Sequence, residues 1–288
     1  DTSMELLIVF GIGGLIGALI AWTSNAYVSG IHFFTELREN HSLFEISLAG
    51  NQFEFASLIF LWVAAGIVIV IRRVFGVVRW HGPADSIYHA QQSKEPLDIK
   101  HGIASTLTAF TSAAGGGSVG QYGPLVHFGA TLGIAVKRFV SSRLSHEVYL
   151  GCGVAAAISA GFGAPIAGIV FAHEAVLRHF SVRAIAPISI ASVTASAVSQ
   201  SFFNTSATFN ISTSAPDLVS VIPVLIIASP IIAIAAIVYM EALRCSVAIA
   251  KHTGWSAERL VITAATICGL VGIWIPEILG LGIGPINA

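Results

Sequence analysis

A long stretch without charged side chains runs from Leu6 to Thr35, near the start of the sequence. About 20 apolar residues suffice for a helix to cross the hydrocarbon core of a bilayer, so a helix of this length has to tilt. Gly13 and Gly17 stand within it at the GxxxG spacing, which favours close contact with a second helix. Charged residues make up only 10% of the chain, against about 25% in soluble domains. The chain is therefore expected to lie in a membrane.

Further apolar segments of spanning length follow. We expect helices within Phe55 to Ile71, Ala184 to Pro216, Leu218 to Met240 and Leu260 to Ile275. Arg72, Arg73 and Arg79 follow the first of these segments and mark a cytoplasmic end, because basic residues favour that side of a membrane. The fold class predicted is all-α, a polytopic membrane protein with tilted and broken transmembrane helices, in which residues 1–288 form one transmembrane domain.

Glycine and proline interrupt two more apolar segments, Gly102 to Val136 and Tyr149 to Ala172, so that each predicts two helices rather than one. Three breaks in the chain share one form, a glycine-containing turn followed by proline: His81-Gly82-Pro83, Tyr122-Gly123-Pro124 and Gly163-Ala164-Pro165. Proline is favoured at the first helical position, so each break predicts a helix start. A helix start presents free N–H groups and the positive end of the helix dipole, which together attract anions. Several starts that converge at mid-membrane would form an anion site.

Other interpretations of these breaks stay open. A single Gly-Pro pair can simply kink a packed helix, and broken helices also occur in coupled transporters for other solutes. A cation path would favour Asp or Glu inside the spans, but Glu147 is the only acidic residue between residues 102 and 172. His101, His127 and His173 could relay protons. We interpret them instead as packed or pore-lining side chains with satisfied N–H groups.

Enzyme and metal functions find little support in the sequence. His173-Glu174 could open an HExxH zinc motif, but the next histidine is His179, about 120° around a helix from His173. Cys152, Cys245 and Cys268 have no CxxC spacing and are interpreted as packed small hydrophobic residues. The net charge of −1 gives no indication of nucleic acid as a partner. The sequence thus predicts a protein that is not an enzyme.

The motifs around the breaks resemble those of the CLC family of chloride channels and transporters. The residues GQYGP from Gly120 to Pro124 are similar to the family's G-K/R-E-G-P motif. The segment from Gly151 to Glu174 is similar to the family's run of small residues, Ala-Pro break and helix ending in acidic residues. Trp80 to Asp85 matches the G-S-G-I-P-E motif more weakly. The resemblance implies an inverted-repeat pore, of which this chain is mostly the first repeat; the second repeat and its site residues are expected in a longer protein.

Three positions depart from the family's motifs. Tyr122 replaces the gating glutamate; phenols ionise near pH 10, so this side chain stays neutral and can only donate a hydrogen bond to chloride. Ala175 stands where the family has its internal proton-transfer glutamate, and His81 where it has a coordinating serine. The resemblance with these departures implies passive, channel-like conduction of chloride or similar small anions. A proton-coupled antiporter of the same family that uses another proton route is the alternative.

The predicted anion site follows from the breaks and the resemblance together. It comprises His81, Gly82, Pro83, Gly120, Gln121, Tyr122, Gly123 and Pro124, with Tyr122 as the gate and Ala175 as the proton-route position without glutamate. Chloride is the expected ligand, and no catalytic residue, metal or cofactor is predicted. The expected partners are small inorganic anions, membrane lipid and a second copy of the chain in a homodimer. The resemblance places the protein in the plasma (inner) membrane.

Overall fold

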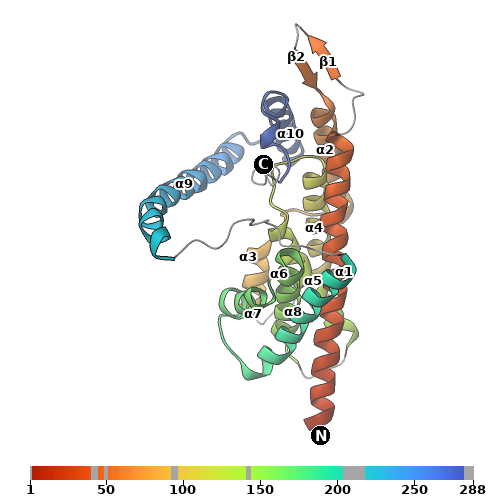
Figure 1. Cartoon of the computed structure of the whole chain (residues 1–288). Helices are drawn as coiled ribbons and strands as arrows, with labels where there is room; N and C mark the ends of the chain where they lie inside the picture. Colours follow the sequence, from red (N-terminus) through yellow and green to blue (C-terminus); the bar gives the residue numbers. More distant parts are fainter. Residues whose placement is uncertain are drawn as a thin grey trace. The chain divides into compact units, whose positions relative to one another are not determined.

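The computed structural model describes residues 2–39, 45–48, 51–91, 97–140, 144–203 and 218–281. Two compact units, residues 1–208 with 265–288 and residues 209–264, are considered separately. The first unit contains α1 (Thr2–Glu39), α2 (Ala56–Phe75), α3 (Pro83–Gln91), α4 (Ile99–Ala114), α5 (Tyr122–Phe139), α6 (His146–Phe162), α7 (Pro165–Phe171) with a π-helical turn (Ala172–Leu177), and α8 (Val182–Phe203). Figure 1 shows the helical ribbon, which confirms the predicted all-α class. A short antiparallel hairpin of β1 (Glu45–Leu48) and β2 (Asn51–Glu54) was not predicted.

Five of the described helices are long and apolar enough to cross a membrane. They are the segments Ile8–Arg38, Ala56–Phe75, Arg183–Phe203, Val221–His252 and Ala257–Trp274. Each lies where the sequence predicted a span. The 38 residues of α1 extend over roughly 57 Å at a rise of ~1.5 Å per residue, almost twice the ~30 Å hydrocarbon thickness. This length agrees with the tilt expected from the sequence.

The second unit consists mainly of α9 (Leu218–His252), which leads into α10 (Ala257–Trp274). Its span has a mean hydropathy of 2.8, the highest of the five, and none of that window is buried within the chain. Pro223 and Pro230 lie inside α9, near its N-terminal end. The sequence also predicts a polar, extracytoplasmic stretch from Asn204 to Ser214, which lies outside the described residues.

Both interrupted apolar segments form two helices, as predicted. α4 ends at Ala114, and the glycine-rich turn that follows places Gly116 at a φ of +94°, a conformation that side chains disfavour. Gly163 ends α6 at a φ of +64°. Pro165 then stands at the first position of α7, where its missing N–H costs no hydrogen bond.

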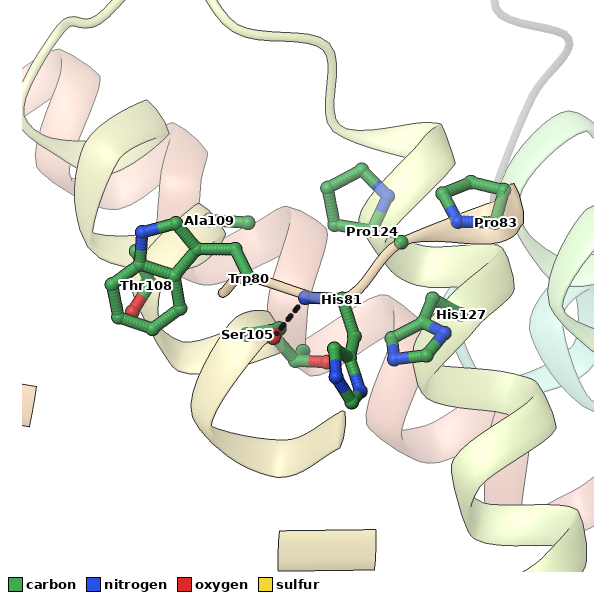
Figure 2. Close-up of a pocket in the computed structure, with 10 residues that line it drawn as sticks. Trp80, His81, Pro83, Ser105, Thr108, Ala109, Pro124 and His127 are labelled. Carbon is green, nitrogen blue, oxygen red and sulfur yellow. Dashed lines mark hydrogen bonds between the residues drawn. The ribbon is translucent and has the colours of Figure 1, made fainter. Parts of the chain in front are cut away.

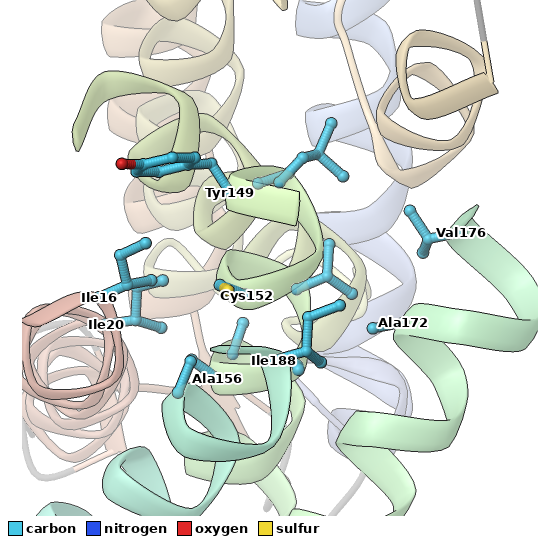
Figure 3. Packing of buried hydrophobic residues seen from close by; sticks show 14 of the residues in the cluster. Ile16, Ile20, Tyr149, Cys152, Ala156, Ala172, Val176 and Ile188 are labelled. Atoms are coloured by element: carbon cyan, nitrogen blue, oxygen red, sulfur yellow. The ribbon is translucent and has the colours of Figure 1, made fainter. Parts of the chain in front are cut away.

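The core of the first unit is centred on α6. This helix contacts α1, α5, α7 and α8, and every residue from Val148 to Ala160 is buried. Figure 3 shows how the core is built from neighbouring helices, with Tyr149, Cys152 and Ala156 of α6 beside Ile16 and Ile20 of α1 and Ile188 of α8. Cys152 therefore packs as predicted. The same interpretation is wrong for Cys245, which is exposed on α9.

Glycines allow the helices of this core to approach closely. A Cβ added at Gly13 would lie 2.8 Å from the carbonyl oxygen of Pro187 in α8, and one at Gly17 would overlap that of Ala191. The predicted GxxxG contact is thus confirmed, with α8 as the partner helix. α5 and α6 meet in the same way, because a Cβ at Gly153 would overlap the carbonyl oxygen of Gly129. The rigid α5–α6 pair positions the start of α5 described next.

Candidate functional site

The first element of the candidate site is the start of α3. Pro83 is its first helical residue, as predicted. Asp85 accepts a hydrogen bond from the backbone N–H of Gly82 at 2.8 Å and pairs with Arg79. Burial opposes ionisation of Asp85, but the Gly82 N–H and the Arg79 guanidinium outweigh it and keep the pKa of this carboxyl below its ordinary value. A fixed carboxylate therefore already occupies part of this helix start.

The loop before α3 is fixed to α4 through His81. Its backbone N–H donates to the Ser105 hydroxyl at 2.8 Å, and its ring stacks on that of His101, with centroids 5.4 Å apart. Burial lowers the pKa of His81, with the Asp85 charge opposing this effect. The His81 imidazole is consequently neutral at physiological pH and can donate from only one ring nitrogen.

The second element is the start of α5. The helix begins at Tyr122, so that Pro124 takes the third helical position rather than the first. A Cβ added at Gly123 would lie 3.5 Å from Cγ of Pro83, which shows that the two helix starts are neighbours. The Tyr122 ring stacks on Phe162, the last residue of α6, with ring centroids 4.0 Å apart. Tyr122 thus connects the start of α5 to the break that follows α6.

A cavity of about 150 Å³ lies between these elements (Figure 2). Its lining residues come from the loop before α3 and the first residue of that helix, from α4 and from α5: Trp80, His81, Gly82, Pro83, Ser105, Thr106, Thr108, Ala109, Pro124 and His127. Ser105, Thr108 and Ala109 follow the i, i+3, i+4 spacing, which places them on one face of α4. Pro124 and His127 share a face of α5 in the same way. Figure 2 shows the His81 and His127 rings next to each other at one end of this group.

Of the predicted site residues, His81, Gly82, Pro83 and Pro124 line the cavity. Gly123 and Tyr122 lie at the adjacent start of α5, whereas Gly120 is exposed and Gln121 is buried. Ala175 is half-buried in the π-helical turn after α7. The residues that line the cavity do not include Gly120, Gln121, Tyr122, Gly123 or Ala175.

The third predicted helix start, at Pro165, does not line this cavity. The Pro165 carbonyl accepts a hydrogen bond from the Ser192 hydroxyl of α8 at 2.8 Å. Gly168, one turn later, packs so closely on Ala155 of α6 that an added Cβ would overlap its carbonyl oxygen. The start of α7 is thus held by contacts with α6 and α8. The expected convergence is seen for two of the three starts.

Three lining residues were missing from the predicted site although their polar atoms are buried. Ser105, Thr108 and His127 are 6%, 9% and 1% exposed. His127 binds the Ser86 hydroxyl through Nδ1 at 2.7 Å, but its Nε2 has no partner among the described residues. His127 is packed, as predicted, and its N–H is satisfied in the tautomer that carries the proton on Nδ1, next to the Ser86 hydroxyl. The spacing of polar residues on the apolar α4 was the signal that could have found Ser105 and Thr108.

His173 resembles His127 in being fully buried with Nε2 unpartnered in the described part of the chain. Its Nδ1 lies 3.3 Å from the backbone carbonyl of His179, and its ring stacks on Phe180. The His179 ring instead lies near the Glu147 carboxylate. Among the described residues, no group of three or more His, Cys, Asp or Glu side chains is arranged to hold a metal ion.

Comparison with known proteins gives a consistent result. A family profile described as voltage gated chloride channel matches residues 61–288. A putative ClcB-like chloride channel protein of Ralstonia nicotianae is 29% identical over 118 residues, which cover 39% of this chain and 28% of that protein. The voltage-gated ClC-type chloride channel ClcB of Shigella flexneri is 24% identical over 202 residues, or 69% of this chain and 45% of that protein. The chain therefore spans less than half the length of these curated relatives.

Two solved structures share the fold. One is a slow cyanobacterial Cl⁻/H⁺ antiporter, which has a TM-score of 0.74 at 16% sequence identity. The matched region is 96% of this chain and 66% of the antiporter chain. The other is a CLC-type fluoride/proton antiporter, which has a TM-score of 0.74 at 21% sequence identity. The matched region is all of this chain and 71% of the antiporter chain. At these identities the likeness concerns the fold.

Proposed function

Since the chain belongs to the voltage gated chloride channel family, known as CLC, we propose that the full-length protein moves chloride or similar small inorganic anions across a membrane. The proposal is carried by one observation: the helix starts at Pro83 and Tyr122 adjoin a single cavity. Helix starts favour negative charge through their N–H groups and dipole. The five apolar helices of spanning length identify an integral membrane protein, and both curated relatives carry the name chloride channel.

We further propose that the transport is passive and channel-like. The family's two proton-route positions, as aligned by resemblance, hold Tyr122 and Ala175, and neither side chain can carry a carboxylate proton. The Tyr122 ring packs on Phe162 instead of projecting a charge. By the same resemblance, the protein is proposed to be a homodimer in the plasma membrane. Chloride is its proposed ligand, and no cofactor or catalytic residue is proposed.

Proton-coupled antiport is the second candidate function. Both solved structures with this fold are described as proton antiporters. In the present chain, the imidazoles of His101, His81 and His127 follow one another through ring contacts of 5.4 and 6.2 Å between centroids. An imidazole can accept a proton on one ring nitrogen and donate one from the other, so such a row offers groups that could take the place of the missing carboxylates.

Flux measurements on the full-length protein in proteoliposomes separate the two functions. An outward chloride gradient is expected to drive chloride efflux that depends on a potassium ionophore for charge balance, with no accompanying proton uptake. A chloride electrode and a pH electrode would record both ions in the same vesicles. Proton movement in a fixed ratio to chloride would contradict the passive mechanism, and vesicles that release no chloride would contradict anion transport itself.

Replacing Asp85 by asparagine is expected to strengthen chloride binding. The carboxylate is only 14% exposed and occupies the start of α3 beside the cavity, so it competes with a mobile anion for the same positive potential. Removing one partly screened charge is expected to lower the dissociation constant of chloride by about three-fold. Isothermal titration of the purified full-length protein with sodium chloride would measure the change.

Asp98→Asn provides the matched control for this charge change. Asp98 caps α4 by accepting from the Lys100 N–H at 2.9 Å, but it is 50% exposed and does not line the cavity. Asparagine caps a helix about as well as aspartate, and solvent screens an exposed charge. Equal effects of the two substitutions would show that Asp85 acts through the net charge of the protein rather than through the helix start.

A further inference from the structure

A buried arginine lies at the end of the first helix of spanning length. Arg38 is the last residue of the span Ile8–Arg38 and is only 6% exposed. Arginine is almost never buried to this extent unless its charge has partners, and charged side chains within spanning segments are rare and usually serve a function. No role was predicted for Arg38 from the sequence. The contacts of its guanidinium therefore indicate what it does.

The guanidinium of Arg38 packs against two glycines that are far apart in the chain. A Cβ added at Gly116 would overlap Nη1 of Arg38, and one at Gly280 would lie 3.7 Å from Nη2. Both glycines have a positive φ, +94° at Gly116 and +74° at Gly280, which glycine adopts more readily than any other residue. The N–H of Gly280 also donates to the carbonyl of Gly116 at 2.9 Å. The end of α1, the glycine turn after α4 and the turn at Gly280 therefore meet at one guanidinium.

This meeting point is connected to Tyr122 in two ways. Along the chain, only five residues separate Gly116 from Tyr122. In space, Leu281, the residue after the second glycine, packs with Tyr122 against one hydrophobic cluster that includes Tyr27 of α1 and Leu125 of α5. A displacement of either glycine turn is therefore expected to move the start of α5.

We propose that Arg38 is a positioning residue, which fixes the start of α5 by holding the glycine turn after α4 and the turn at Gly280 together. A planar guanidinium presents several donors at fixed angles, whereas the ammonium of lysine is a point charge on a flexible stem. Arg38 is not itself an anion ligand, because it acts through the position of Tyr122 and of the N–H groups at this helix start. The inference rests on the proposed function only where anion flux is its readout.

Arg38→Lys tests the proposal without relying on transport, because it keeps the charge and removes the planar fork. Hydrogen exchange of the full-length protein would be followed by mass spectrometry. Peptides that contain residues 116–122 or 279–281 are expected to exchange about five-fold faster, since fewer contacts oppose their local opening. Peptides from α6 and α8 are expected to exchange as before. Arg244→Lys is the matched control, because the Arg244 side chain is 74% exposed on α9, and it is expected to leave all of these peptides unchanged.

Gly116→Ala provides a second variant, which displaces the guanidinium from the other side of the contact. Gly76→Ala is its control, because Gly76 also has a positive φ, +65°, but has nothing within 4 Å of an added Cβ. Both variants strain the backbone, yet only Gly116→Ala is expected to speed exchange in residues 279–281. Unchanged exchange there in both Arg38→Lys and Gly116→Ala, or an equal rise throughout the first unit, would overturn the proposal.

The ratio of chloride to nitrate flux from proteoliposomes shows whether this position matters for anion transport. The ratio does not depend on how much of the protein is folded. A shifted helix start changes the space that an anion meets, so Arg38→Lys is expected to change the ratio about three-fold and Arg244→Lys to leave it unchanged. An unchanged ratio in Arg38→Lys would overturn the positioning role, while the unchanged protein would still conduct. If the unchanged protein releases neither anion, the proposed function fails, and the exchange measurements still decide what Arg38 holds in place.

Discussion

Replacing Tyr122 by glutamate is expected to reduce chloride efflux from proteoliposomes about ten-fold at neutral pH, because a carboxylate at a helix start competes with the anion. Tyr122 is the first residue of α5, and the start of α5 neighbours that of α3. Glutamate ordinarily ionises near pH 4.3 and is charged above that pH. The ten-fold reduction of chloride efflux is therefore expected near pH 7, where the carboxyl is fully ionised, and is expected to disappear as the pH falls through the pKa of the introduced carboxyl. Chloride-electrode recordings on the full-length protein at a series of pH values would measure it.

Tyr122→Gln is the control for this experiment. Glutamine matches glutamate in size and also loses the stacking of the Tyr122 ring on Phe162, but it carries no charge at any pH. Its chloride flux is expected to stay within about two-fold of the unchanged protein and to vary little with pH. If glutamine and glutamate reduced the flux equally at every pH, the loss of the aromatic contact would be responsible, and the helix start would not be an anion site.

The local signals in the sequence predicted the helix boundaries well. Pro83 and Pro165 begin helices and Gly163 ends one at a positive φ, because these residues restrict or extend the backbone conformations at their own positions. Pro124 was placed less well, since α5 begins two residues earlier at Tyr122. Spans and breaks are properties of short segments, so a single sequence is sufficient to predict them.

The composition of the site depended on contacts that no short segment contains. Nothing around Pro165 signals that Ser192, 27 residues later, donates to its carbonyl and that α7 packs on α6 and α8. In the same way, the Ser86 hydroxyl that binds His127 is 41 residues away in the chain. Which of three similar helix starts share a cavity is decided by tertiary packing. The sequence analysis could therefore predict the kind of site but only part of its lining.

Gly153→Leu is expected to be the most destabilising single change in the described part of the first unit. An added Cβ would overlap the carbonyl oxygen of Gly129 in α5, and backbone atoms in a packed helix pair cannot move aside as a flexible side chain does. Overpacking a core costs about 1–3 kcal/mol, and a leucine adds three further carbon atoms beyond that Cβ. The free energy of unfolding is expected to fall by about 3 kcal/mol. Most of the expressed protein should then be lost as aggregate in size-exclusion chromatography.

Gly66→Leu is the matched control, because Gly66 also lies in the middle of a helix, α2, but has nothing within 4 Å of an added Cβ. Leucine is a better helix former than glycine by about 0.8 kcal/mol, so this variant is expected to elute like the unchanged protein. Normal elution of Gly153→Leu would mean that α5 and α6 can separate without loss of the fold. The neighbouring starts of α3 and α5 would then lack the rigid support that holds an anion site in shape.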